Sequence, residues 1–279
     1  MTTDGDTARQ GRDDGRDGST DPTAGIGLER QGPTAVIRLC HPPAHAWTRR
    51  GAEVLKARLA ELSCDGGVYA LVITGEGDKF FSAGADLKAF SDGDKPAAQA
   101  MIRSIGEAFE ALSAFPGVTI AALNGYAMGG GLECALACDL RIAEEHVQMA
   151  LPEATVGLLP AAGGTQWLPW LVGEGWAKRM ILCGERIDAA RALAIGLVEE
   201  VVPRGQSLPA ALALAARAAL QSPGSVAACK ALIQQARQRP PRHALGAERE
   251  RFMDLFGTQD QTEGVRAFLE KRPPRWRNA

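Results

Sequence analysis

The chain has 279 residues and a formal net charge of −2, from 31 Lys and Arg against 33 Asp and Glu. Hydrophobic residues make up 46% of it, which is enough to bury the core of one large domain or two ordinary ones. The near-neutral charge argues against binding nucleic acid through bulk charge, and no apolar run approaches the roughly 20 residues that cross a bilayer. We therefore expect a globular protein with neither a nucleic-acid nor a membrane partner.

Six cysteines are scattered along the chain without a CxxC pair, at positions 40, 64, 134, 138, 183 and 229. Most have apolar neighbours, which is typical of reduced, buried thiols in a cytoplasmic protein. The four histidines show neither HExxH nor HxH spacing, so we expect no metal site.

Residues 1–25 differ in composition from the rest of the chain. The stretch from Met1 to Thr23 is rich in Asp, Arg, Gly and Thr and has almost no large apolar residue. Such a segment cannot bury enough surface to offset the entropy lost on ordering, so we predict a disordered tail. It shows no hydrophobic segment of secretory type and is too acidic for a typical transit peptide. Order is expected to begin near Ile26.

The next part of the chain alternates short apolar runs with amphipathic segments. Apolar runs bounded by turn residues predict strands at 34–40, 69–74, 117–123 and 139–143. Apolar residues at helical spacing predict helices at 51–63, 97–114 and 132–138. This alternation favours an α/β core with right-handed crossovers between strands.

From residue 163 the pattern becomes helical, with one further strand at 198–202. The predicted helices are 163–172, 174–183, 187–195, 207–221, 223–237, 245–257 and 260–271. We therefore divide the ordered chain into an α/β core at 26–205 and a helical C-terminal region at 206–279.

Several well-known motifs are absent from the sequence. No GxGxxG follows a strand, which argues against a Rossmann nicotinamide site. The loop Gly75-Glu-Gly-Asp-Lys79 lacks the GxxxxGK[ST] spacing of a phosphate loop and is better interpreted as a surface turn. The absence of GxSxG argues against Ser82 as the nucleophile of an α/β-hydrolase.

Two loops of small residues are more informative, because each follows a predicted buried strand. They are Phe81-Ser-Ala-Gly-Ala-Asp86 and Asn124-Gly-Tyr-Ala-Met-Gly-Gly-Gly131. Small residues allow a ligand to approach the backbone, and the second loop leads into a helix whose first N–H groups favour negative charge. Two such N–H donors aimed at one point would form an oxyanion hole. Ordinary tight turns are the alternative interpretation of the same pattern.

Two glutamates lie in apolar surroundings close behind the glycine loop. Glu133 is early in the predicted helix, and Glu153 lies within Ala-Leu-Pro-Glu-Ala-Thr-Val-Gly. A carboxylate among apolar residues is costly unless it is paired, hydrogen-bonded or protonated. Together the two could hold and activate a water molecule. Separately, Glu133 could be a first-turn carboxylate favoured by the helix dipole and Glu153 a surface loop charge.

At these residues the chain closely resembles the enoyl-CoA hydratase/isomerase (crotonase) family, over roughly residues 26–277. The resemblance rests on blocks that occur in family order and spacing: 81–88 (FSAGADLK), 124–133 (NGYAMGGGLE), 152–153 (PE), 157–166 (GLLPAAGGTQ), 184–189 (GERIDA) and 263–274 (EGVRAFLEKRPP). It implies an α/β fold built as a spiral of ββα turns, followed by a helical C-terminal region used in trimer assembly. Such trimers often pair into hexamers.

The resemblance also implies roles for particular residues. The backbone N–H groups of Ala85 and Gly130 correspond to the oxyanion hole, which holds the thioester carbonyl of an acyl-CoA. Glu133 and Glu153 correspond to the paired catalytic carboxylates of the hydratase subgroup. An orienting backbone N–H of the family falls at Ala161.

The other implied positions line the thioester or the CoA. They are Ala83, Asp86, Leu87 and Lys88 along the thioester and pantetheine arm, Ala44 and Ala46 in the first CoA loop, and Phe268 and Lys271 at the nucleotide end, from a neighbouring subunit. The resemblance implies no separate cofactor, because coenzyme A is part of the substrate.

The chain departs from the family pattern at a few positions. His45 stands where Asn is usual, and Trp47 is bulkier than the usual Leu. Ala161 replaces a common Gly, and Trp167 and Trp170 occur where basic residues are common. These changes bear on the shape of the acyl pocket and the CoA entrance more than on the reaction class.

The expected activity is the addition of water to a 2-enoyl-CoA to give a 3-hydroxyacyl-CoA. One glutamate removes a proton from the water that attacks C3, and the other supplies a proton at C2; either assignment is compatible with the sequence. A Δ3,Δ2-enoyl-CoA isomerase or another acyl-CoA enolate enzyme is an alternative with the same fold. A non-catalytic acyl-CoA-binding protein is an alternative of another class.

Overall fold

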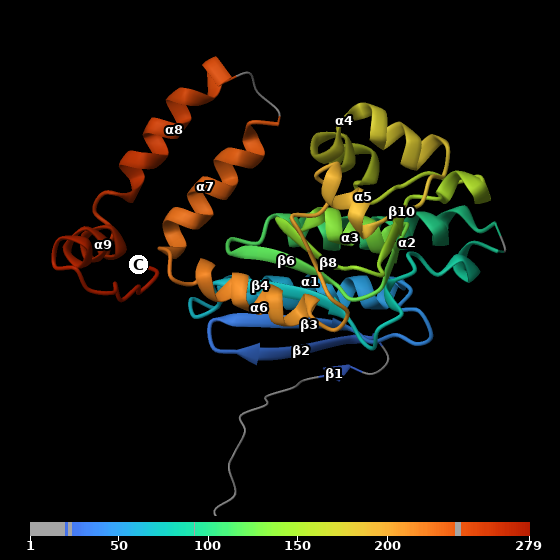
Figure 1. Cartoon of the computed structure of the whole chain (residues 1–279), viewed down its shortest axis with the longest axis horizontal. Coiled ribbons are helices and arrows are strands. Elements are labelled where there is room, and N and C mark those ends of the chain that lie inside the picture. The colour runs from blue at the N-terminus through green and yellow to red at the C-terminus, as the bar shows by residue number, and fades with distance from the viewer. Residues whose placement is uncertain (1–19, 22–23, 92, 238–240) are drawn as a thin grey trace, which may run out of the picture.

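Two β-sheets with helices packed on them form the centre of the structure, a computed structural model that describes residues 20–21, 24–91, 93–237 and 241–279 (Figure 1). Within these residues the large sheet has seven strands in the order β1-β2-β3-β4-β6-β8-β11. The small sheet has four strands in the order β10-β9-β7-β5. The two sheets together confirm the predicted α/β class.

The large sheet is mostly parallel. Its strands are β1 (Thr20–Asp21), β2 (Ile26–Gln31), β3 (Thr34–Leu39), β4 (Ala70–Gly75), β6 (Val118–Leu123), β8 (Leu140–Glu144) and β11 (Glu200–Val202). At one edge, β2 pairs antiparallel with both β1 and β3, and the other pairs of the sheet are parallel. β4 is buried along its whole length, as its continuously apolar sequence predicts for a strand covered on both faces. The predicted strands at 34–40, 69–74, 117–123 and 139–143 are confirmed, and the one predicted at 198–202 is shorter.

The small sheet is built from very short strands: β5 (Phe80–Ser82), β7 (Tyr126–Met128), β9 (Gln148–Ala150) and β10 (Ile187–Asp188). None of them is predicted above, because two or three residues are too few to show a hydrophobic period. The parallel strands β5, β7 and β9 each follow a strand of the large sheet and precede a helix. This repeat of strand, strand and helix is the ββα spiral that the resemblance implies.

Helices cover both faces of the large sheet. On one side lie α1 (Arg49–Cys64), α2 (Lys95–Ser113) and the short, wholly buried α3 (Gly130–Ala137). Side chains of α1 and α2, among them Leu55 and Phe109, share the main hydrophobic cluster with Leu71 and Ile73 of β4. α4 (Gly164–Leu182) is broken at Gly173, where φ is 75°, so the two helices predicted there are confirmed as two segments. α5 (Ala189–Ala194) follows β10.

The other face of the large sheet is covered by α6 (Ser207–Ala218). Its Ala211 and Ala215 are fully buried in a second hydrophobic cluster with Val72 and Ile120 of the sheet. Small alanine side chains let the helix approach the sheet closely. The structure therefore places α6 with the α/β core, although our division at residue 206 assigns it to the C-terminal region.

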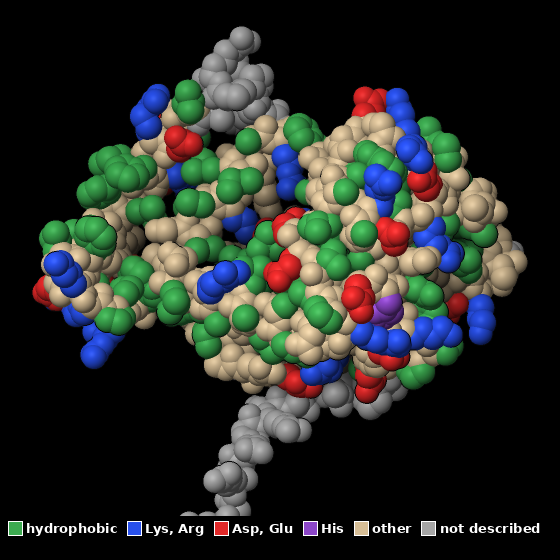
Figure 2. Space-filling model, viewed as in Figure 1, with side chains coloured by type: hydrophobic (Ala, Val, Ile, Leu, Met, Phe, Trp, Pro, Cys, Tyr) green, Lys and Arg blue, Asp and Glu red, His purple; other side chains and the backbone are tan. Residues whose placement is uncertain are grey.

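The last helices, α7 (Pro223–Gln235), α8 (Pro241–Leu255) and α9 (Gln259–Leu269), lie to one side of the sheets (Figure 1). They carry many exposed apolar side chains, and Figure 2 shows hydrophobic groups on their surface. Those at least 48% exposed include Ile233, Leu245, Phe252, Met253, Phe256, Val265, Phe268 and Leu269. The described chain itself leaves this apolar surface uncovered.

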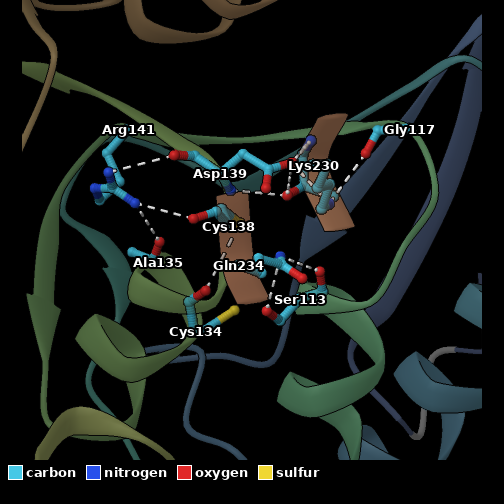
Figure 3. A network of polar contacts seen from close by, with 10 residues as sticks. Ser113, Gly117, Cys134, Ala135, Cys138, Asp139, Arg141, Lys230 and Gln234 are labelled. Atoms are coloured by element: carbon cyan, nitrogen blue, oxygen red, sulfur yellow. Dashed lines mark hydrogen bonds and ion pairs between the residues drawn. The ribbon is translucent and has the colours of Figure 1, made fainter. Parts of the chain in front are cut away.

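A polar network fastens α7 to the core (Figure 3). Lys230 Nζ donates to the carbonyl oxygen of Gly117 at 3.1 Å and to Oδ2 of Asp139 at 2.8 Å. One turn later, Gln234 Nε2 donates to the carbonyl oxygen of Ser113 at 3.0 Å. These contacts join α7 to the starts of β6 and β8 and to the end of α2.

The structure corrects two expectations. Thr20 and Asp21, inside the stretch for which we predict disorder, pair with Gly27 and Ile26 as strand β1; the rest of Met1 to Thr23 lies outside the described residues. All six cysteines lack a disulfide, but only Cys134 and Cys138 are buried, so the expected burial is wrong for Cys64, Cys183 and Cys229. Among the described residues, no helix is both long and apolar enough to cross a membrane.

We predict that Lys230→Met lowers the free energy of unfolding by about 1.5–3 kcal/mol, because it removes two charge-assisted hydrogen bonds from a mostly buried site. Urea unfolding monitored by circular dichroism measures the change. Lys178→Met is the control, since Lys178 forms only a surface pair with Glu174 on α4. Equal midpoints for the two variants would contradict an anchoring role for Lys230.

Candidate active site

Three neighbouring strands of the small sheet deliver the candidate residues to one place. β5, β7 and β9 are parallel neighbours, so their carboxyl ends lie at the same edge of the sheet. Ala85 follows β5, Gly130 follows β7 and Glu153 follows β9. The carboxyl edge of parallel strands is a common location for binding sites.

A cavity of about 230 Å³ opens at this edge. Seven of the positions singled out from the sequence line it: Ala83, Ala85, Leu87, Gly130, Glu133, Glu153 and Ala161. Asp86 lies beside it and caps the 3₁₀ helix η1 (Leu87–Phe90) by accepting from the N–H of Lys88. Phe268 of α9 and Lys271 just after it are not among the residues that line the cavity. The chain by itself therefore does not bring these two to the site.

The loop that carries Ala85 is joined to the segment around Trp47. The N–H of Ala83 donates to the carbonyl oxygen of Ala44 at 2.9 Å, and the N–H of Trp47 donates to that of Gly84 at 2.8 Å. The N–H of Asp86 donates to the carbonyl oxygen of Trp47 at 3.0 Å. The neighbours of Ala85 thus make the hydrogen bonds to the Trp47 segment, and the N–H of Ala85 makes none to it.

Gly84 brings the loop against the start of α3. Its φ of 95° lies in the region that favours glycine, and a Cβ there would be 2.8 Å from the carbonyl oxygen of Met128. The same Cβ would be 3.1 Å from the amide nitrogen of Gly130. Only a residue without a side chain allows this close approach of the two loops.

The amides of Ala85 and Gly130 meet at the cavity. A Cβ built on Gly130 would lie 3.5 Å from the nitrogen of Ala85. Gly130 is the first residue of α3, where an N–H has no acceptor within the helix. Within the described part of the chain neither amide donates a hydrogen bond. Two adjacent N–H groups without acceptors at a cavity wall can donate to one ligand atom, which is the geometry that an oxyanion hole requires.

Glu133 is held by two backbone amides. Its side chain is 3% exposed, and Oε1 accepts from the N–H of Ala162 at 2.8 Å and of Gly164 at 2.9 Å. Burial raises the pKa of this carboxyl, while the two hydrogen bonds act in the opposite direction. The amides that contact Glu133 are thus those of Ala162 and Gly164, and the orienting role implied for the amide of Ala161 stays a prediction. Ala161 lines the cavity.

Glu153 has a different environment. It begins the 3₁₀ helix η2 (Glu153–Val156), and its Oε2 is buried without a hydrogen-bond partner among the described residues. Burial, with a contribution from the negative charge of Glu133, raises the pKa of Glu153 to about 7. Its Oε1 lies against Gly129, where a Cβ would be 3.0 Å away. This carboxyl can therefore hold or release a proton near neutral pH.

One part of the cavity wall is apolar, and its residues have no role assigned from the sequence. Phe90, Ile102, Leu158 and Leu159 line the cavity and also a neighbouring groove of about 870 Å³. The adjacent leucines in a glycine-bounded loop are the only sequence signal for this surface. Among the described residues, no group of three or more His, Cys, Asp or Glu side chains is placed to hold a metal ion.

The chain is similar to known proteins over most of its length. The family model described as Enoyl-CoA hydratase/isomerase matches residues 29–279. The 2,3-dehydroadipyl-CoA hydratase of Escherichia coli (strain K12) is 40% identical over 248 residues, which cover 88% of this chain and 96% of that protein.

Solved structures are similar over nearly the whole chain. Pseudomonas aeruginosa DspI superposes with a TM-score of 0.90 and 62% identity, covering 93% of this chain and 99% of DspI. The enoyl-CoA hydratase of Bacillus anthracis superposes with a TM-score of 0.88 and 34% identity, covering 91% of this chain and all of that one. With the ββα spiral, the two loops and the full-length matches in agreement, the chain belongs to the enoyl-CoA hydratase/isomerase (crotonase) family.

Proposed function

We propose that this enzyme adds water across the 2,3 double bond of a 2-enoyl-CoA to give a 3-hydroxyacyl-CoA. The observation that carries the proposal is the presence of two carboxyl groups, Glu133 and Glu153, in the same cavity as the two available amides. Amides alone would suit any enzyme that forms an acyl-CoA enolate. The second carboxyl supplies what hydration needs in addition, an acid and a base on one water molecule.

In the proposed mechanism the thioester oxygen accepts hydrogen bonds from the N–H groups of Ala85 and Gly130. Water attacks C3 and gives a proton to Glu133, while the π electrons of the double bond move toward the thioester and C2 takes a proton from Glu153. The negative charge that develops on the thioester oxygen is stabilised by the two amides, which are already in place. We assign the base to Glu133 because two N–H groups favour its ionised form, and the acid to Glu153 because its pKa of about 7 lets it keep a proton.

The CoA is proposed to lie along the loops that form the oxyanion hole. Ala83, Asp86, Leu87 and Lys88 would follow the thioester and pantetheine arm, with Ala44 and Ala46 on the adjacent segment. The acyl group would extend along the apolar wall toward Leu158 and Leu159. No cofactor is needed, since the reaction only moves protons and water.

We further propose that the chain assembles as a homotrimer or hexamer through its C-terminal helices. The exposed apolar side chains of α7, α8 and α9 favour a partner surface there. In such an assembly Phe268 and Lys271 would reach the nucleotide end of a CoA bound to a neighbouring subunit. The unpaired thiols favour a reducing compartment such as the cytoplasm.

Product analysis tests the proposed reaction. Crotonyl-CoA incubated with the protein in ¹⁸O-water is expected to give 3-hydroxybutyryl-CoA that carries one labelled oxygen. Turnover of a 3-enoyl-CoA without incorporation of oxygen would identify an isomerase instead. Binding of enoyl-CoA esters without any turnover would identify a non-catalytic acyl-CoA-binding protein.

We predict that Glu133→Gln and Glu153→Gln each lower kcat for hydration by roughly 10²–10⁴-fold, since each removes one partner of the proton transfer. Glutamine has nearly the same shape, and in Glu133→Gln its oxygen can still accept from Ala162 and Gly164. Steady-state loss of the enoyl-thioester absorbance measures the effect. Glu200→Gln, on the exposed surface of β11, is the control and should keep wild-type activity. Full activity in both active-site variants would rule out the paired-carboxylate mechanism.

The pH profile should show that the pair works with one shared proton. Above the Glu153 pKa of about 7 the acid loses its proton, so kcat/KM should fall about tenfold per pH unit. During hydration Glu153 gives a proton to C2 and Glu133 takes one from water, so the number of protons on the pair stays the same. The rate of the reverse reaction, dehydration of 3-hydroxybutyryl-CoA, should therefore fall in parallel above pH 7. Initial rates in both directions between roughly pH 5 and 9 measure this. A flat profile above neutral pH would contradict the assignment.

Gly130→Ala is expected to block the oxyanion hole without disturbing the fold. The nearest neighbours of the new Cβ lie at 3.5–3.7 Å, which is ordinary contact. The methyl group would stand 3.5 Å from the nitrogen of Ala85, where the thioester oxygen is proposed to bind. If this methyl group keeps the oxygen away from the Ala85 N–H, the effect should resemble the loss of one donor, which typically lowers kcat by roughly 10²–10³-fold. Ala85→Ser keeps its N–H and should have a mild effect. Equal kcat values for both variants would argue against these two amides.

A further inference from the structure

We propose that Trp47 is a positioning residue that sets the separation of the two oxyanion-hole amides. It is 2% exposed and does not line the cavity, so it acts through other residues rather than on the substrate. The inference rests on the proposed use of the Ala85 and Gly130 amides, but not on whether the reaction is hydration or isomerisation. It follows from contacts that this one residue makes with both halves of the site.

The backbone of Trp47 holds the loop that carries the Ala85 amide. Its N–H donates to the carbonyl oxygen of Gly84, and its carbonyl oxygen accepts from the N–H of Asp86. Gly84 and Asp86 are the two neighbours of Ala85, so both peptide groups that flank Ala85 are tied to one residue. Trp47 and Ala85 accordingly form a parallel β-bridge outside the two sheets.

The side chain of Trp47 faces the other part of the oxyanion hole, the amide of Gly130 at the start of α3. Its Cδ1 lies 3.6 Å from the position that a Cβ of Gly130 would take. On its other side the indole meets the ring of Phe109 on α2 edge to face, with 5.2 Å between the ring centroids. The indole therefore lies against α2 and faces the start of α3 at Gly130. Because interiors are close-packed, removing the indole would leave a void beside α3, and we expect α3 to shift relative to the Ala85 loop.

A second link keeps the loops together when the indole is removed. Ser82 Oγ donates to the carbonyl oxygen of His45 at 2.7 Å and accepts from the N–H of Gly84 at 3.2 Å. The backbone bonds of Trp47 also do not depend on its side chain. Truncation of Trp47 should therefore spare the Ala85 loop and loosen mainly its spacing from Gly130.

The indole N–H makes no hydrogen bond within the described residues. What the side chain supplies is therefore its shape, and phenylalanine can replace most of that shape without leaving a polar group unpaired. This makes Trp47→Phe the conservative variant and Trp47→Ala the disruptive one. Phe115→Ala is a matched control, because Phe115 is an equally buried aromatic side chain of the same hydrophobic cluster that does not line the cavity.

The test needs a readout that structural destabilisation alone would not move. Acetoacetyl-CoA is a suitable ligand for this readout, because its enolate absorbs in the near ultraviolet. An oxyanion hole raises the enolate fraction of the bound thioester, and no turnover is needed to see it. Four proteins are compared: wild type, Trp47→Phe, Trp47→Ala and Phe115→Ala. The measurements are the enolate band, kcat and KM with crotonyl-CoA, the affinity of butyryl-CoA, and the melting temperature.

Trp47→Ala is expected to lower kcat and the bound enolate fraction together, by roughly tenfold to hundredfold, with KM and butyryl-CoA affinity within about threefold of wild type. Trp47→Phe should recover most of the loss. Phe115→Ala should lower the melting temperature but keep the wild-type kcat per folded enzyme. If Trp47→Ala does not fold, Trp47→Leu replaces it in the same comparison, because leucine retains part of the apolar volume.

Two results would overturn the inference. One is a Trp47 variant whose enolate band and kcat match those of Phe115→Ala. The other is a wild-type protein that binds acetoacetyl-CoA with no enolate band, since there would then be no oxyanion hole to position. A wild-type protein that shows the band, and loses it in Trp47→Ala, but does not hydrate crotonyl-CoA would refute the proposed function and still support the role of Trp47.

Discussion

Two backbone N–H groups without acceptors, those of Ala85 and Gly130, are the feature on which the rest of the site depends. Buried amides nearly always find a partner, so each must be kept available by its surroundings. Ala85 is kept so because its neighbours take the bonds to Trp47, and Gly130 because it begins α3. Their meeting requires β5 and β7 to be parallel neighbours, which places the loops that follow them at one edge. The small sheet thus matters more for the site than its size suggests.

The sequence predicts the parallel strands of the large sheet and most helices, because buried parallel strands are continuous apolar runs and amphipathic helices have a clear period. It does not predict the antiparallel edge strands β1 and β2. It also locates both glutamates and both glycine-rich loops, since carboxylates and glycines in apolar surroundings are locally unusual. The strands β5, β7 and β9 are too short for such signals, and only tertiary pairing reveals them. The amides of Ala162 and Gly164 are missed for a related reason. Their partner Glu133 is about thirty residues away, and backbone N–H groups leave no mark on composition.

The carboxyl groups of Glu133 and Glu153 are chemically identical, but the surroundings of their oxygens give them different proton affinities. Glu133 is more deeply buried, yet both its hydrogen bonds favour the ionised form and hold the carboxylate in one orientation. Glu153 has a buried oxygen with no donor among the described residues, so its neutral form is favoured. A pair of carboxyls with separated proton affinities is what acid and base roles on one water require. Backbone amides supply the difference, because the loop at 161–164 folds over the first turn of α3.

The division between backbone and side chain also explains how the chain departs from the family pattern without losing the site. The groups proposed to polarise the thioester are main-chain N–H groups, so a substitution alters them only by moving the backbone or blocking the space in front of them. At His45 and Trp47, where the resemblance implies departures from the family pattern, the bonds to the Ala85 loop are made by backbone atoms of these two residues. The apolar wall of the cavity, along which the acyl group is proposed to lie, is in contrast formed by the side chains of Phe90, Ile102, Leu158 and Leu159. Substrate preference can therefore change along this wall while the geometry at Ala85 and Gly130 is retained.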